Sequence, residues 1–295
     1  MSASIMNGKH VAFELGQILQ NDVANFTQQM HRSPGLAVIL VGDDPASCIY
    51  VTNKRNACLT LGFESFYYNL SADASENELL LLIDALNEKD DVDGILVQLP
   101  LPSHIMTETI IERIKPTKDV DGFHPYNIGR LAQGNPALRP CTPLGVINLL
   151  KYYQISLTGK HAVVIGASNI VGRPMALEFL LAKATVTICH RATRDLEQHI
   201  RMADIVVSAA GSLNVISLEW LHKNQVIIDI GIHRLQDGSI CGDINFNEAK
   251  DKVAWITPVP GGVGPMTICM LLHNTLLAAK QNLFIDQVAN SIDII

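Results

Sequence analysis

The chain has 295 residues, with 22 basic and 29 acidic side chains and a formal net charge of -7 at pH 7. Because domains commonly hold about 100 to 200 residues, this length favours two compact domains. Hydrophobic residues make up 48% of the chain and charged residues 17%, which excludes a disordered polypeptide. The acidic balance, with no run rich in Lys and Arg, argues against a nucleic-acid partner.

The cysteines and the N-terminal segment indicate in which cellular compartment the protein is expected. The six cysteines are too widely spaced for zinc or redox motifs, so we expect reduced thiols in the core or lining a site: Cys48, Cys58, Cys141, Cys189, Cys241 and Cys269. The first residues do not form a secretory signal. No segment is apolar for the roughly 18 residues that a membrane helix needs. We therefore expect a cytoplasmic protein without a membrane partner.

The first half alternates helical and strand patterns. Helical periodicity and short apolar runs predict, in chain order, a helix over 8–31, a strand over 36–41, helices over 47–61 and 75–89, and a strand over 94–99. The last run is apolar and bounded by Gly and Pro, as buried parallel strands are. This alternation is typical of βαβ architecture.

The second half restarts after a segment rich in Pro, Gly and Asn. Residues 116–145 show little periodicity, so we interpret them as an interdomain connection or site-lining loop. The pattern then predicts strands over 161–165, 184–189, 204–210 and 225–230, with helices over 172–182 and 264–282. Short apolar strands separated by helices indicate a doubly wound α/β sheet.

A glycine-bracketed turn, Gly166-Ala-Ser-Asn-Ile-Val-Gly172, joins the first strand and helix of this second half. Such glycines let the backbone approach a pyrophosphate at the helix N-terminus. The spacing departs from GxGxxG, and a simple packing turn is the alternative.

The strand over 184–189 ends in Cys189-His190-Arg191, where NAD enzymes usually carry an acidic residue that binds the ribose hydroxyls. A cation there suits a 2′-phosphate. We therefore predict NADP as cofactor, bound by Arg191 with help from Arg194. The alternative is that Arg191 is a solvated surface residue.

Three other segments carry candidate chemistry. Tyr50 and Lys54 share one helix face, and Gln98 ends an apolar strand, where α/β sheets place site residues. In Lys118-Asp-Val-Asp-Gly-Phe-His124, the residues Asp119, Asp121 and His124 are either metal ligands or, more commonly for such residues, loop caps. We predict no metal.

Four longer motifs give the chain a family resemblance: Gly94-Ile-Leu-Val-Gln-Leu-Pro-Leu-Pro102, Lys118-Asp-Val-Asp-Gly-Phe-His124, Pro140-Cys-Thr-Pro143 and Pro258-Val-Pro-Gly-Gly-Val-Gly-Pro-Met-Thr267. In this order they resemble the bifunctional methylenetetrahydrofolate dehydrogenase/cyclohydrolase family, along essentially the whole chain. The resemblance implies a folate-binding catalytic α/β domain over 1–140, a Rossmann-like NADP domain over 141–264 and a cleft between them. It further implies that a C-terminal helix over 265–295 packs back on the first domain, and that the protein is a homodimer.

The resemblance also implies roles for single residues. Lys54 would handle protons, Tyr50 would stack on the folate, Gln98 would hydrogen-bond and tune Lys54, and Asp121 would bind the pterin nitrogens. The folate site would also include Val97, Leu99, Pro260, Gly261, Gly262, Val263 and Gly264, and the dinucleotide site would include Gly166, Ala167, Ser168, Arg191 and Ile232. Some family members carry an arginine where this chain has Ala167, so one phosphate contact is missing.

The implied activity is oxidation of 5,10-methylenetetrahydrofolate with NADP, then hydrolysis of the methenyl product to 10-formyltetrahydrofolate, in the one-carbon metabolism that serves purine biosynthesis. Two alternatives stay open at this point. The nucleotide half alone would fit an NADP-dependent dehydrogenase of another small metabolite, or a module that senses NADP without turnover.

Overall fold

The computed structural model describes residues 2–292, and the side chains of residues 2–281. The chain forms two compact units. Unit 1 comprises Met1–Glu14, Leu131–Asn135 and Pro140–Met270, and unit 2 comprises Leu15–Arg130, Pro136–Arg139 and Leu271–Ile295. Unit 1 thus includes the start of the chain, which the family resemblance assigns to the first domain. The boundaries of the functional domains stay a prediction.

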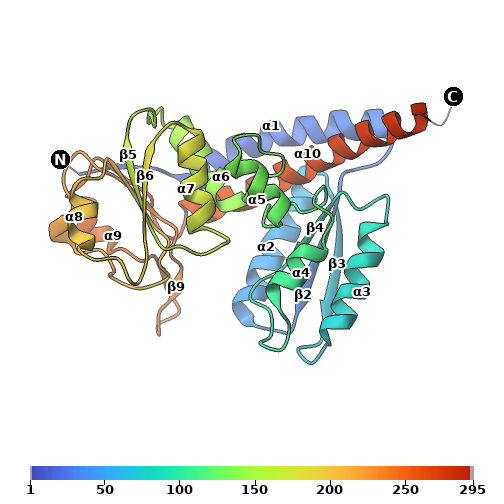
Figure 1. Cartoon of the computed structure of the whole chain (residues 1–295), viewed down its shortest axis with the longest axis horizontal. Helices are drawn as coiled ribbons and strands as arrows, with labels where there is room; N and C mark the ends of the chain where they lie inside the picture. Colours follow the sequence, from blue (N-terminus) through green and yellow to red (C-terminus); the bar gives the residue numbers. More distant parts are fainter. Residues whose placement is uncertain (1, 293–295) are drawn as a thin grey trace. The chain divides into compact units, whose positions relative to one another are not determined.

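Unit 2 is built on a parallel sheet of three strands in the order β3-β2-β4: β2 (Gly35–Val41), β3 (Glu64–Leu70) and β4 (Gly94–Val97) (Figure 1). The strands predicted over 36–41 and 94–99 are confirmed, although β4 ends two residues earlier. Strand β3 was not predicted because its residues are mostly half-exposed and give no apolar run. The order places the crossover helices on the two faces of the sheet.

All or most of five helices belong to this unit: α1 (Gly8–Met30), α2 (Pro45–Leu61), α3 (Glu76–Asn87), α4 (Thr107–Arg113) and α5 (Pro125–Ala132). Helix α2 packs on β2 and β3, and α3 packs on β4. Ala37, Ile39 and Val41 of β2 form one buried cluster with residues of α3 and α4. Because side chains alternate along a strand, Leu36, Val38 and Leu40 point to the opposite face. All seven residues of β2 are buried, so β2 is the centre of this core.

Unit 1 contains a six-stranded parallel sheet in the order β1-β11-β8-β7-β5-β6. Its strands are β1 (Ser4–Ile5), β5 (His161–Ile165), β6 (Thr185–Cys189), β7 (Ile205–Ser208), β8 (Val226–Asp229) and β11 (Trp255–Ile256). The four strands predicted in this half and the doubly wound topology are confirmed. The chain passes from β5 to β6 on one side and to β7 on the other, so the strand order reverses at β5, where such sheets bind ligands.

Helices α6 (Cys141–Tyr152), α7 (Gly172–Leu181), α8 (Leu196–Arg201), α9 (Phe246–Ala249) and α10 (Val263–Ile292) complete the regular structure, with a short 3-10 helix (Leu218–Trp220) and the hairpin of β9 (His233–Arg234) and β10 (Ile240–Cys241). The prediction of an irregular segment over 116–145 is wrong in part, because α5 and the start of α6 lie in it. Prolines at 140 and 143 mask the onset of α6, yet proline is tolerated in the first turn of a helix.

The last helix, α10, has residues in both units. In unit 2, the Asn274 side chain donates to the carbonyl oxygens of Val120, at 2.9 Å, and Arg139, at 2.8 Å. The predicted packing of 265–295 on the first domain extends beyond the described side chains and stays a prediction. All six cysteines are free thiols. Among the described residues, no helix combines the length and apolar character needed to cross a bilayer.

Candidate functional site

Helix α2 positions the predicted Tyr50 and Lys54. The Asp44 carboxylate accepts a hydrogen bond from the Ser47 amide at 2.8 Å, which caps the first turn, and Pro45 opens the helix. Gly62, with φ of 83°, ends it in the left-handed conformation that glycine adopts without strain. Tyr50 and Lys54 therefore lie one turn apart on one face of a helix with fixed ends.

The side chains of Lys54 and Gln98 are in contact. Lys54 Nζ donates to Gln98 Oε1 at 3.0 Å, and Gln98 Nε2 donates to the Leu99 carbonyl at 2.7 Å. The Gln98 amide continues the parallel ladder past the end of β4 by donating to the Ile39 carbonyl. These bonds orient the side-chain amide so that its oxygen faces the ammonium group. Among the described residues, the Lys54 ammonium group forms this hydrogen bond and no ion pair with a carboxylate.

Asp121 is the titratable neighbour of this pair. Burial raises the pKa of Asp121 to about 6, while the charge of Lys54 lowers it and the charge of Asp119 raises it. Burial also raises the pKa of Tyr50. The site thus combines an amine, a phenol and a carboxyl group that changes charge near neutral pH, which are groups able to bind and exchange protons.

Asp119 has a local structural role. Its carboxylate accepts hydrogen bonds from the amides of Phe123, at 3.2 Å, and His124, at 2.8 Å, and from Asn127 Nδ2, at 2.8 Å. His124 Nδ1 in turn accepts from the Tyr126 amide. Burial raises the pKa of Asp119, and the three donors lower it. Asp119 and His124 therefore cap the loop that leads into α5, the alternative to metal binding that the sequence left open.

No group of three or more His, Cys, Asp or Glu side chains suited to a metal ion occurs among the described residues.

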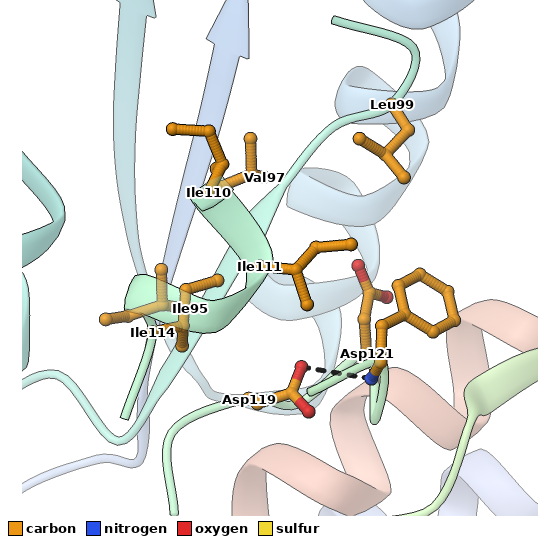
Figure 2. A pocket seen from close by; sticks show the side chains of 9 residues that line it. Ile95, Val97, Leu99, Ile110, Ile111, Ile114, Asp119 and Asp121 are labelled. Atoms are coloured by element: carbon orange, nitrogen blue, oxygen red, sulfur yellow. Dashed lines mark hydrogen bonds between the residues drawn. The ribbon is translucent and has the colours of Figure 1, made fainter. Parts of the chain in front are cut away.

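A small pocket adjoins Asp121 (Figure 2). Its walls are apolar side chains of β4 and α4, and its polar groups are two carboxylates: it is lined by Ile95, Val97, Leu99, Ile110, Ile111, Ile114, Asp119, Asp121 and Phe123. The predicted substrate residues Val97, Leu99 and Asp121 thus share one surface. Its free space is on the order of one water molecule, so by itself the pocket does not accommodate a ring system.

The loop predicted to line the folate site lies in unit 1, where Pro260, Gly261 and Gly262 precede α10, while Val263 and Gly264 form its first turn. The Gly261 carbonyl accepts from the Lys9 amide at 3.0 Å, and Gly261 has φ of 102°. A Cβ atom on Gly8 would lie 1.8 Å from the Gly262 carbonyl oxygen. The loop is therefore packed tightly against the start of α1, and its folate contacts stay a prediction.

The glycine turn after β5 lies where the strand order of unit 1 reverses. Gly166 has φ of 117°, and a Cβ atom there would lie 2.2 Å from the Ala209 carbonyl oxygen. A Cβ atom on Gly172 would lie 2.0 Å from the Gly166 carbonyl oxygen. Ser168 Oγ accepts from the amides of Val171 and Gly172. Both glycines are thus required by close backbone approach, in a turn that opens onto the N-terminus of α7.

The remaining predicted cofactor residues follow other strands of the same sheet. Arg191 is exposed after β6, in a turn where Thr193 Oγ1 accepts from the His190 amide at 2.8 Å. Within the described part of the chain, Arg191 and Arg194 have no ion-pair partner. Ile232 follows β8 and is 48% exposed. Since the strands are parallel, the carboxyl ends of β5, β6 and β8 bring these residues and the glycine turn to one edge of the sheet.

Two buried carboxylates at this edge, Asp229 and Asp243, were not predicted. Asp229 ends β8 and Asp243 follows β10, and both accept hydrogen bonds from the loops around them. Burial raises the pKa of Asp229 to about 6, while hydrogen bonds from the amides of Ile244 and Asp243 lower it. The available signal in the sequence was Gly242 beside Asp243, since glycine admits a close approach.

Comparisons with known proteins cover both units. Residues 6–121 match the family "Tetrahydrofolate dehydrogenase/cyclohydrolase, catalytic domain", and residues 140–283 match "Tetrahydrofolate dehydrogenase/cyclohydrolase, NAD(P)-binding domain". The bifunctional protein FolD of Legionella pneumophila (strain Corby) is 58% identical over 281 residues, which are 95% of this chain and 99% of the relative.

Two solved structures are similar along nearly their whole length. The bifunctional FolD of Campylobacter jejuni has a TM-score of 0.92 and 49% identity, covering 95% of this chain and 100% of that one. The FolD of Trypanosoma brucei, complexed with NADP cofactor and an inhibitor, has a TM-score of 0.92 and 38% identity, covering 96% and 99%.

Proposed function

Since this chain belongs to the tetrahydrofolate dehydrogenase/cyclohydrolase family and is a bifunctional enzyme of one-carbon folate metabolism, we propose how its residues divide the two reactions. The enzyme oxidises 5,10-methylenetetrahydrofolate with NADP and hydrolyses the 5,10-methenyl product to 10-formyltetrahydrofolate. The observation that carries the assignment of residues is the hydrogen bond from Lys54 to Gln98, beside Asp121 with its raised pKa.

In the first reaction the protein's part is orientation. Bound NADP supplies the acceptor for a hydride from the methylene carbon between N5 and N10 of the folate. Tyr50 stacks on the folate, and the carboxylate of Asp121 accepts hydrogen bonds from the amino group and ring nitrogen of the pterin. Holding the two reactants in register removes much of the entropic barrier to transfer. Val97, Leu99 and the loop over 260–264 complete the folate surface.

In the second reaction water adds to the methenyl carbon and loses a proton. The new hydroxyl group then loses its proton to form the formyl carbonyl, while the bond from that carbon to N5 breaks and N5 gains a proton. Lys54 is the group that handles these protons, and Gln98 fixes its position through the 3.0 Å hydrogen bond. General acid-base catalysis of this kind contributes about 10²- to 10⁴-fold in rate. The hydrolysis itself transfers no hydride, so it depends on the residues of unit 2 more than on the dinucleotide site.

The residues at the edge of the unit 1 sheet fit a dinucleotide phosphate. The glycine turn offers close backbone approach at the start of α7, and Arg191 is an exposed cation without an ion-pair partner among the described residues. Ala167, Ser168 and Ile232 adjoin the same edge. Because Ala167 supplies no cation, Arg191 carries the preference for the 2′-phosphate of NADP over NAD, with Arg194 as its helper.

The proposal is tested by incubating the purified protein with 5,10-methylenetetrahydrofolate and NADP or NAD, while following reduced cofactor, methenyl and 10-formyl products separately. We expect NADP reduction and accumulation of the 10-formyl product. Dehydrogenation with NAD alone would overturn the role of Arg191. Absence of folate turnover with either cofactor would favour a dehydrogenase of another metabolite, and tight NADP binding without any product would favour a sensing module.

Finer properties are proposed on the family resemblance: a homodimer, a cytoplasmic location and supply of formyl groups for purine biosynthesis. The 10-formyl product is a one-carbon donor of the oxidation level that purine rings incorporate. Sedimentation at micromolar concentration tests the dimer, and cell fractionation tests the location.

A further inference from the structure

Buried Asp243 lies at the centre of a hydrogen-bond network under the edge of the unit 1 sheet. Its Oδ2 accepts from Ser208 Oγ at 2.8 Å and from the amides of Ala210 at 3.0 Å and Gly211 at 3.3 Å. Its Oδ1 accepts from the Ser212 amide at 3.1 Å and contacts His233 Nε2 at 2.7 Å. The side chain is completely buried, so these protein donors replace water around the carboxylate.

These donors come from two different loops. Ala210, Gly211 and Ser212 belong to the loop after β7, whereas His233 belongs to the segment after β8. The second loop is also held by Asp229, which accepts from the amides of Gly231 at 3.0 Å and Asp243 at 3.0 Å. A single carboxylate therefore ties together two loops that leave neighbouring parallel strands at their carboxyl ends.

The loop after β7 adjoins the glycine turn. The Ala209 amide donates to the Ile165 carbonyl at 2.8 Å, and the Ala209 carbonyl oxygen would lie 2.2 Å from a Cβ atom on Gly166. Gly211, Ser212 and Ile232 are exposed, although the amides of Gly211 and Ser212, like that of Ala210, donate inward to Asp243. The network thus fixes the two loops through their buried side, and a ligand could contact their exposed side.

We propose that Asp243 is a positioning residue for the dinucleotide, which holds the loops after β7 and β8 in the conformation that binds NADP. The inference rests on the proposed nucleotide site at this edge of the sheet. Asp243 acts through the loops and does not itself contact the cofactor. An ionised carboxylate suits this role because it only accepts hydrogen bonds, whereas an amide in its place would direct an N–H group at other donors.

The test compares D243N with S208A, which removes one donor to the carboxylate, and with D237N as the matched control. Asp237 is exposed in the turn between β9 and β10, and its carboxylate accepts only from Ser239 within the described residues. For each variant, NADP affinity is measured by calorimetry, and the KM for NADP and kcat are measured in the dehydrogenase reaction. The cyclohydrolase rate is measured directly on 5,10-methenyltetrahydrofolate without NADP.

We expect D243N to raise the Kd and KM for NADP by about tenfold or more, because buried donors lose their acceptor and the loops rearrange. S208A is expected to raise them only about two- to threefold, and D237N to change neither. The cyclohydrolase rate of all three stays within about twofold of the parent. A folded D243N protein with parental NADP affinity would overturn the proposal, as would equal losses of NADP affinity and cyclohydrolase rate.

Should D243N not fold, S208A and H233A decide the question, since each removes one side-chain donor and leaves the carboxylate in place. Unchanged NADP affinity in both would then overturn the proposal. A parent protein that does not bind NADP would instead refute the proposed nucleotide site, so the two failures are distinguishable.

Discussion

The amine of Lys54 carries the clearest prediction at the scale of single residues. We expect Lys54→Met to lower the cyclohydrolase rate by about 10²- to 10⁴-fold, because no other amine is placed on that face of α2 to exchange the protons. Thr52→Ala, at an exposed position of the same helix, serves as the control. Stopped-flow measurement of methenyl hydrolysis checks the difference, and hydrolysis at parental rate by the methionine variant would exclude Lys54.

Asp121 links the folate site to stability. Because burial raises its folded pKa to about 6, above the unfolded value, the ionised form is disfavoured in the fold. The contribution of this group to stability is present below the unfolded pKa and is lost as pH rises through about 6. Asp121→Asn removes that loss, and the variant is expected to be more stable than the parent by about 1 to 3 kcal/mol at pH 7.5, with little difference at pH 4.

Urea unfolding at both pH values checks this, with Asp73→Asn as the exposed control. The same variant loses the carboxylate that accepts from the pterin, so the acid limb of kcat/KM near pH 6 should disappear along with most folate affinity. A variant less stable than the parent at pH 7.5, or one that retains the acid limb, would contradict this account of Asp121.

Arg191 determines the cofactor preference in the proposed site. Arg191→Ser is expected to raise the KM for NADP by about 10- to 100-fold, with less change for NAD, because a charge-assisted contact to the 2′-phosphate is lost. Steady-state kinetics with both cofactors measure the ratio. An unchanged ratio would move the preference to Arg194 or another group.

Single residues differ in how far the sequence predicts them. Lys54 and Gln98 lie 44 positions apart. Each was singled out by its place on a helix face or at a strand end, and the family resemblance then implied the hydrogen bond between them. The network of Asp243 was not found, because its donors are up to 35 positions away and no motif marks them. Hydrogen bonds between distant loops leave no periodicity in the sequence.

At the scale of elements, the turn between β5 and α7 requires glycine at two positions, because a side chain there would clash with the backbone. Gly172→Ala would place a methyl group 2.0 Å from the Gly166 carbonyl oxygen, so we expect the turn to shift and NADP affinity to fall by about tenfold or more. Gly129→Ala in α5 meets no atom within 4 Å and should leave NADP affinity unchanged. Equal affinities for NADP in the two variants, measured by calorimetry, would show that the turn is not part of the nucleotide site.

Strands could be predicted from the sequence where all of their residues are buried. The buried strands β2, β4, β5, β7 and β8 form apolar runs because both of their faces are covered. By contrast, β1 and β11 have two residues each, too few for any period to show. Helix α6 was missed because its prolines resemble a loop signal, although they stand in its cap and first turn.

At the scale of the whole molecule, the two ligands should protect different parts of the chain. Hydrogen exchange is expected to slow on addition of NADP in the backbone of 166–172 and 209–212, and on addition of a folate analogue around Tyr50, Gln98 and Asp121. Each ligand stabilises the fold that binds it, by about 2.7 kcal/mol at a free concentration 100 times its Kd. If NADP without folate slowed hydrogen exchange in α2, the assignment of NADP to unit 1 and folate to unit 2 would be contradicted.

The pairing of β1 with β11 has a consequence for biosynthesis. Ser4 pairs with Trp255 and Ile5 with Ile256, so during synthesis β1 waits for a partner encoded about 250 residues later. The sheet of unit 1 is therefore completed only after Ile256 has been synthesised, whereas β2, β3 and β4 of unit 2 are complete once Val97 has been added. Nascent chains shorter than about 256 residues carry an unpaired edge, which makes them candidates for chaperone binding.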